Sequence, residues 1–173
     1  MTRKEKLEAI EALLRGQSTL TLSTADASGQ PHATPLFYLM GSDCDLYWFS
    51  SPASVHSRNV AGTPEAACAI FAATANWKEI CGVQMHGMVS KVADRTLRRE
   101  ISEAYRERFH LGSMFRLAMA KSALYCFRPY WIRYLDNTRR FGFKFEVTFE
   151  SVTRSPLPLS CHPERRSCEK TPN

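Results

Sequence analysis

Residues 46–60 carry the sequence LYWFSSPASVHSRNV, which predicts a strand followed by a short helix. The apolar and aromatic residues at its start are typical of a strand, which we expect to end at Ser50. Residues 54–60 have the composition of a short helix or helical turn. A helix N-terminus exposes unpaired N–H groups and a partial positive charge, so this junction suits a phosphate group.

Side chains around the junction strengthen this hypothesis. The serines that could donate a hydroxyl are Ser50, Ser51, Ser54 and Ser57. His56 and Arg58 add positive or partly positive charge. Arginine presents a planar, permanently charged fork that can hold phosphate with two hydrogen bonds. A capped helix with Arg58 in solvent fits the same residues, and this stretch alone leaves both interpretations open.

Strand patterns lie on both sides of the junction. The segments with strand character are 18–24, 32–40, 45–50, 66–73, part of 77–92, 124–128, 131–135 and 141–149. We expect the first three to form an antiparallel meander, because turn sequences separate them by hairpin-length connections. In the last segment, alternation predicts that Phe141, Phe143, Phe145, Val147 and Phe149 point the same way.

Helices are expected at the N-terminus and in the second half of the chain. Thr2 and Glu5 have the spacing of a capping box, and Gly16 is well placed to end that helix. Asp94 is suited to cap a helix that reaches about His110, and a short helix follows over 114–119. The fold class is therefore mainly β with helices (α+β), and closure of the strands into a barrel would remove exposed edges.

Two further stretches contain candidate ligand contacts. Pro35, within GQPHATP at 29–35, removes a backbone donor and implies an edge, a bulge or a surface facing a ligand. Together with Thr34 it could leave backbone groups free for the polar edge of a flat ring, although a bulged barrel strand fits equally well. Gln84 is an amide on an otherwise apolar strand, and His86 nearby is more typical of a structural histidine than of a catalyst.

Residues 129–144 combine aromatic side chains with a turn. Trp131 and Tyr134 are core residues by default, and the same cluster could supply an aromatic wall over a ring. Asn137 is expected to stabilise a turn by bonding to backbone groups.

Composition excludes several classes of protein. The chain has 173 residues, 44% of them hydrophobic, and a net charge of +6, which suits one globular domain that can bind small anions. Arginines within 95–108 have the spacing of a solvated helix face, so we do not expect nucleic-acid binding. We find neither an apolar run long enough to cross a bilayer nor a secretory signal, and expect a cytoplasmic protein without a membrane partner.

Catalytic and metal-binding motifs are not found. The sequence contains no hydrolase elbow, P-loop, Rossmann fingerprint or HExxH motif, and no catalytic residue is identified. The six cysteines include no CxxC pair, so reduced and mostly buried thiols are expected. Cys161, His162 and Cys168 offer only three donors without a second ligand pair, so no metal site is predicted.

The composition changes near residue 150. Residues 151–173 hold four of the nine prolines and no aromatic residue. Such a segment buries too little apolar surface to offset its ordering entropy. We therefore predict a domain over residues 1–150 and a disordered C-terminal tail over 151–173.

Together these stretches resemble the FMN-binding split-barrel superfamily, the pyridoxamine 5'-phosphate oxidase-like proteins. The resemblance runs from about Ser18 to Val147. Its motifs here are LST at 22–24, GQPHATP at 29–35, YWFS at 47–50, SVHSRNV at 54–60 and GVQ at 82–84 with Gly87. Residues 104–109, 135–138 and 141–144 resemble the corresponding segments of a small bacterial branch of that superfamily.

The resemblance implies a six-stranded antiparallel split β-barrel that forms a homodimer, with FMN in a groove between the subunits. It assigns phosphate contacts to Ser50, Ser54, His56 and Arg58, and ring and ribityl contacts to Thr34, Pro35 and Gln84. Trp131 and Asn137 become candidates for a wall contributed by the other subunit.

The implied activity is that of a flavin-dependent oxidoreductase. It would pass a hydride or electrons between a reduced nicotinamide and an unknown small-molecule acceptor. The alternative is a binding or storage module for flavin, haem or a deazaflavin. Position 56 is commonly Lys in the superfamily and is His here. The arginine-rich signature of the true pyridoxamine-phosphate oxidases is missing, so that activity is not expected.

Overall fold

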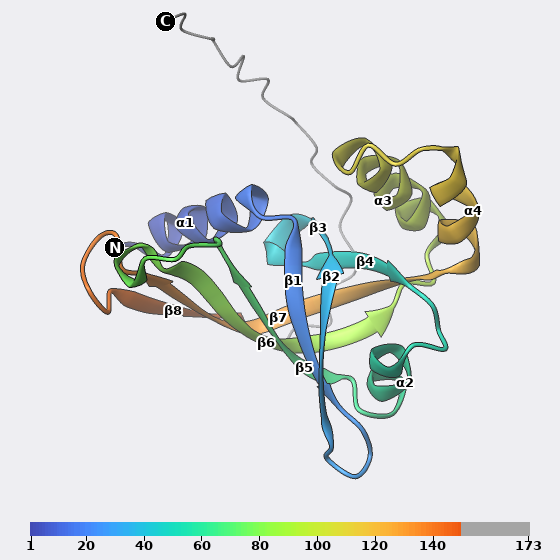
Figure 1. Ribbon diagram of the computed structural model, residues 1–173, viewed down its shortest axis with the longest axis horizontal. Helices are drawn as coiled ribbons and strands as arrows, with labels where there is room; N and C mark the ends of the chain where they lie inside the picture. Colours follow the sequence, from blue (N-terminus) through green and yellow to red (C-terminus); the bar gives the residue numbers. More distant parts are fainter. Residues whose placement is uncertain (150–173) are drawn as a thin grey trace, which may run out of the picture.

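The computed structural model describes residues 1–149, except for the side chains of residues 113–116 (Figure 1). The tail expected over 151–173 lies outside the described residues. The helices are α1 (Arg3–Gly16), α2 (Val55–Gly62), α3 (Arg95–Arg108) and α4 (Ser113–Lys121), with single 3₁₀ turns at Ser42–Cys44 and Trp77–Glu79. The strands are β1 (Thr19–Ala25), β2 (Pro31–Phe37), β3 (Leu39–Met40), β4 (Leu46–Ser50), β5 (Glu65–Phe71), β6 (Cys81–Lys91), β7 (Ala123–Asp136) and β8 (Lys144–Thr148).

All eight strands belong to one antiparallel sheet that curls around the core. Its order is β2-β1-β5-β6-β7-β4-β3, and β8 pairs with β7 beyond this path. The two ends of that order, β2 and β3, are separated in sequence by Tyr38 alone. The chain therefore joins the two edges of the sheet, which confirms the α+β split barrel.

Tyr38 fixes the seam between these edges. Its side chain is fully buried, and its hydroxyl donates to the Leu14 carbonyl oxygen in α1 at 2.6 Å. Its backbone N–H donates to the Ser18 carbonyl oxygen at 3.1 Å. Because both bonds lead to the chain just before β1, the N-terminal helix is attached to the barrel where its two edges meet.

The structure has more strands than the six implied by the resemblance, and two segments differ from expectation. The segment expected as one strand over 32–40 breaks at Tyr38, which turns inward and leaves β2 and β3 on separate edges. The segments expected as two strands, 124–128 and 131–135, form the single strand β7 through Pro129. A register shift opposite Pro129, between His86 and Gly87 of β6, accommodates a residue that cannot donate to the ladder.

The adjacent antiparallel pairings expected of the first three strand segments are present. β1 and β2 form one hairpin, and the end of the same expected segment, β3, pairs with β4, while the other edge of β4 pairs with β7. This pairing places Leu46 and Trp48, both almost fully buried, in the core beside the longest strand. The alternation over 141–149 holds only from Phe143 onward, because Phe141 lies in the preceding turn and is 75% exposed.

The predicted helices are confirmed together with their caps. Thr2 and Glu5 form the reciprocal capping box, and Ile10 and Leu14 pack into the barrel core. The Asp94 carboxylate accepts from two backbone N–H groups at the start of α3. The buried side chains of α3 form a second cluster with residues of β3, β4 and β7: Leu97, Ile101 and Tyr105 with Leu39, Tyr47, Leu124 and Cys126.

Three further findings concern membrane-spanning helices, metal ligands and cysteines among the described residues. None of the described helices has the length and apolar character that a membrane crossing requires. Within residues 1–149, no three His, Cys, Asp or Glu side chains cluster as metal ligands. Cys44, Cys68, Cys81 and Cys126 are free thiols, and only Cys81 is not fully buried.

Candidate functional site

The predicted strand-to-helix junction begins where β4 ends at Ser50. Ser54 has an extended backbone conformation and caps α2, its Oγ accepting from the Ser57 N–H at 3.3 Å. In the tight turn between them, the Ser54 N–H donates to the Ser51 carbonyl oxygen at 3.0 Å. The exposed Ser51 hydroxyl accepts from the Ala53 N–H at 3.2 Å. The sequence therefore predicted the junction, and the structure identifies Ser54 as the cap of its helix.

His56 lies at the centre of a cluster that we call the serine corner, made of Ser50, Ser54, His56 and Ser57. Its Nε2 lies 2.7 Å from the Ser50 Oγ and 3.1 Å from the Ser54 Oγ. The Ser54 hydroxyl also donates to the Ser57 Oγ at 2.8 Å. His56 is 6% exposed, and its burial, with a smaller effect of His32, lowers its pKa. The imidazole is therefore mainly neutral near pH 7.

Strand β2 brings a second histidine to the corner. His32 influences the pKa of His56, and its own Nε2 lies 2.8 Å from the Thr34 Oγ1. Thr34 is thus linked to the serine corner indirectly, by its hydrogen bond to His32. Sequence reasoning did not single out His32, although it lies two residues from Thr34 and therefore on the same face of the strand.

Arg58 and Asn59 continue the site along α2. Arg58 is exposed, and its Nη1 donates to the Ala53 carbonyl oxygen, which holds the guanidinium against the first turn of the helix. Asn59 is a buried polar residue that sequence reasoning missed. Its Nδ2 donates to the Thr24 Oγ1 at 3.1 Å, which ties α2 to β1. Its position three residues after His56, on the same helix face, was the available signal.

Pro35 and Gln84 share one row across the opposite, outer face of the sheet. The pairing register runs from Pro35 through Thr21 and Ala69 to Gln84. Only the small side chains of Thr21 and Ala69 lie between the proline and the amide in this row. Thr34 lies on the other face of β2, because neighbouring strand residues point to opposite sides.

The next row brings His86 and Trp131 together on the same outer face. It runs from Ala33 through Ser23 and Ala67 to His86 and Trp131, whose ring centroids lie 4.6 Å apart. A cavity of about 300 Å³ lies over this row. On its border, the Tyr130 hydroxyl donates to the Glu65 Oε1 at 2.5 Å. We call the two rows together the outer face.

Asn137 lies in the turn after β7, away from both groups of residues. Its Nδ2 donates to the Trp77 carbonyl oxygen at 2.8 Å, and its Oδ1 accepts from the Gly142 N–H at 3.0 Å. These contacts confirm the predicted turn-stabilising role. Its assignment to a cofactor wall stays a prediction, as does that of Trp131.

The curled antiparallel sheet and its peripheral helices define a split-barrel protein. The chain belongs to the pyridoxamine 5'-phosphate oxidase family, whose model matches residues 7–136. No curated protein matches the chain in sequence.

Solved structures share this fold at low sequence identity. HutZ, the heme storage protein of Vibrio cholerae, is 18% identical with a TM-score of 0.59, and the match covers 73% of this chain and 89% of HutZ. A heme binding protein of Mycobacterium smegmatis is 19% identical with a TM-score of 0.64, covering 86% of this chain but 60% of that one. A conserved hypothetical protein of Mycobacterium tuberculosis is 19% identical with a TM-score of 0.68, covering 90% and 94%.

Proposed function

We propose that the protein binds FMN and acts as an oxidoreductase between a reduced nicotinamide and a small-molecule acceptor. The observation that carries this proposal is the convergence of Ser50, Ser54 and His56 at the N-terminus of α2. Membership in the pyridoxamine 5'-phosphate oxidase family supports it. Oxidation of pyridoxamine 5'-phosphate itself is not proposed.

The serine corner fits the phosphate end of FMN by its chemistry. Within residues 1–149, the side-chain hydrogen bonds of Ser50 and His56 go to hydroxyl groups and to each other, and none goes to a carboxylate. A dianion therefore meets no like charge among these partners. The hydroxyls can rotate to donate, and the helix N-terminus and Arg58 add favourable charge.

The flat part of the cofactor would lie on the outer face, which a phosphate held at the serine corner requires it to reach around the edge strand β2. Thr21 and Ala69 leave room for a planar ring between Pro35 and Gln84, and the Gln84 amide can both donate and accept hydrogen bonds. When bound, FMN would supply the hydride- and electron-transfer chemistry. The chain's own residues would bind its phosphate, orient the ring and limit access of water.

We expect Arg58→Ala to weaken FMN binding by roughly 10-fold, because a charge-assisted hydrogen bond contributes about 1.5–3 kcal/mol. Titration of FMN followed by quenching of flavin fluorescence measures the affinity. Arg95→Ala removes an exposed arginine from the start of α3 and should leave the affinity unchanged. Equal affinities of wild type and Arg58→Ala would remove Arg58 from the phosphate site.

The outer face is also the proposed interface of a homodimer. Phe37, Phe71 and Met88 lie in neighbouring rows on the same side of the sheet and are 56%, 60% and 45% exposed, an apolar surface that association would cover. The partner subunit would then contribute Trp131 and Asn137 to the cofactor groove.

Analytical ultracentrifugation should give twice the mass of one chain. Phe71→Asp should convert the dimer to monomer, because a carboxylate would be desolvated in the interface. Phe141→Asp, at an exposed position in the turn before β8, is the matched control and should remain dimeric. A wild-type monomer with FMN bound would contradict the proposed interface.

Heme binding is the second candidate function, because HutZ and the Mycobacterium smegmatis protein are named for it. Parallel titrations with FMN and hemin separate the candidates. FMN binding with oxidation of NADH or NADPH supports the oxidoreductase. FMN binding without turnover supports a flavin storage module, and a Soret band that saturates at one hemin per chain without FMN binding supports the heme-binding alternative.

A further inference from the structure

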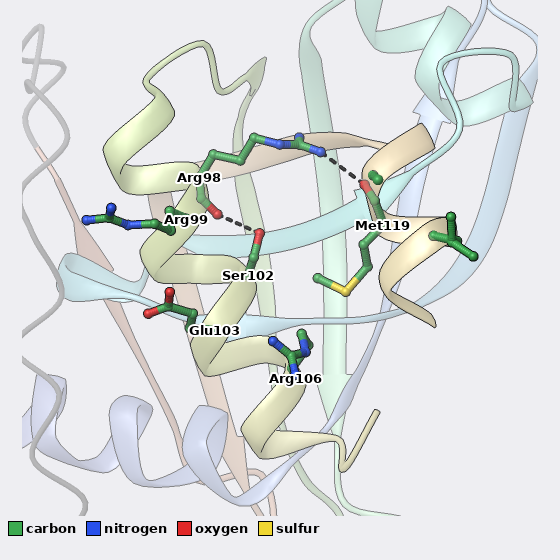
Figure 2. A pocket seen from close by; sticks show the side chains of 8 residues that line it. Arg98, Arg99, Ser102, Glu103, Arg106 and Met119 are labelled. Carbon is green, nitrogen blue, oxygen red and sulfur yellow. Dashed lines mark hydrogen bonds between the residues drawn. The ribbon is translucent and has the colours of Figure 1, made fainter. Parts of the chain in front are cut away.

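A groove between α3 and α4 forms a second candidate site (Figure 2), and its lining includes no residue of the serine corner or the outer face. Its volume is about 660 Å³, within the range of about 300–1,000 Å³ typical of small-molecule sites. Its lining combines three arginines and one glutamate with apolar side chains: Arg98, Arg99, Glu103, Arg106, Leu117 and Met119.

Arg98 holds the two helices that border the groove. Its guanidinium donates to the carbonyl oxygens of Met119 at 3.0 Å and Ser122 at 2.8 Å, at the end of α4 (Figure 2). It also lies over the Phe49 ring, 5.3 Å from the ring centroid. The positive charge of Arg98 is thus fixed at one end of the groove without a carboxylate partner in the described part of the chain.

Arg106 has a buried donor without an acceptor. Its Nε is buried and has no hydrogen-bond partner among the described residues. A buried unsatisfied donor costs free energy, more so when it carries charge. Because Arg106 also lines the groove, its guanidinium is suited to a ligand carboxylate, whose two oxygens match parallel N–H donors.

The remaining charges also favour an anion. Neither Arg99 nor Arg106 forms an ion pair within residues 1–149, although Glu103 lies between them on α3. Three arginines against one glutamate leave the lining with net positive charge. Glu103 would repel an anion, and it disfavours a dianion more than a monoanion.

The other wall of the groove is apolar. Leu117 is 69% exposed and Met119 is buried, and Ala120 lies beside them on α4. An exposed leucine next to unpaired arginines suits a ligand with one charged end and an apolar body. We infer that the groove between α3 and α4 binds a small amphipathic carboxylate, with its carboxylate on Arg106 and its apolar body against Leu117 and Met119.

Isothermal titration calorimetry with dodecanoate below its micelle concentration tests this inference. We expect saturable binding at one site, roughly 10-fold weaker in Arg106→Gln and about 3-fold weaker in Arg99→Gln. Glu103→Gln should bind dodecanoate about 3-fold more tightly, because it removes a like charge. Arg95→Gln, at an exposed arginine of the same helix outside the groove, should match wild type.

Two further measurements separate a site from general surface attraction. Dodecanol should bind far more weakly than dodecanoate, since it has the same chain without the charge. Leu117→Ser should weaken dodecanoate binding at unchanged thermal stability, because Leu117 is already largely exposed. Wild-type affinity in both Arg106→Gln and Leu117→Ser, or equal binding of dodecanol, would each overturn the inference.

Discussion

Gly87→Ala is expected to lower the free energy of unfolding by about 3 kcal/mol or more, beyond the usual cost of an overpacked core position. A Cβ at Gly87 would lie 2.6 Å from the Phe127 Cζ and would collide with the backbone carbonyl of Arg128. A side-chain end can move away, but this carbonyl belongs to the central strand β7. The substitution therefore strains the register shift that accommodates Pro129.

Urea unfolding followed by tryptophan fluorescence measures this effect. Gly62→Ala is the matched control, because no heavy atom lies within 4 Å of the Cβ it would add at the end of α2. The control should be neutral or slightly stabilising, since alanine has the higher helix propensity. A Gly87→Ala protein as stable as this control would show that β6 and β7 can separate locally without cost.

FMN affinity is expected to increase as the pH falls from 8 toward 6, because bound phosphate raises the pKa of His56, and this gain cannot exceed about 10-fold for each unit of that rise. Without ligand, burial and His32 keep that pKa below its ordinary value. A phosphate dianion favours the imidazolium, so binding takes up a proton and becomes tighter as protons become available. Near pH 6 the gain should level off, because FMN phosphate begins to be protonated.

His56→Gln tests the assignment, because glutamine can form hydrogen bonds but does not titrate. Its FMN affinity should be nearly independent of pH over this range and about 10-fold below that of wild type at pH 6.5. His32→Gln removes the neighbouring charge that disfavours the imidazolium, so the wild-type pH dependence should shift toward higher pH. The same pH dependence in His56→Gln as in wild type would exclude His56 as the titrating group.

Local patterns predicted most of the secondary structure. The capping box of Thr2 and Glu5 and the Asp94 cap both lie where the sequence predicted them. The pairing of β4 with β7 could not be predicted from local patterns, because it depends on how the whole sheet closes. The inward turn at Tyr38 also escaped prediction, since its cause is a hydrogen bond to Leu14 in another element.

In the candidate site too, local sequence predicted some contacts, and others depend on how the whole sheet folds. Ser50, Ser54 and His56 are close in sequence, and the structure brings them into contact. Pro35 and Gln84 were candidates from separate stretches of the sequence, and only the pairing register shows that one row of the sheet connects them. The groove between α3 and α4 was not predicted, because helix spacing alone describes the arginines of α3 as a solvated face and does not show α4 beside them.

β4 pairs with β7, a strand that lies much later in the sequence, and this has a consequence for folding during synthesis. Ser50 pairs with Ala123, so ribosomes must synthesise the intervening chain before the barrel can close. At about 5–20 residues per second, this takes on the order of 4–15 s. During that interval the nascent hairpin of β1 and β2 and the apolar strand β4 have no completed barrel to cover them. Holdase chaperones should therefore engage this half of the polypeptide and release it once β7 has emerged.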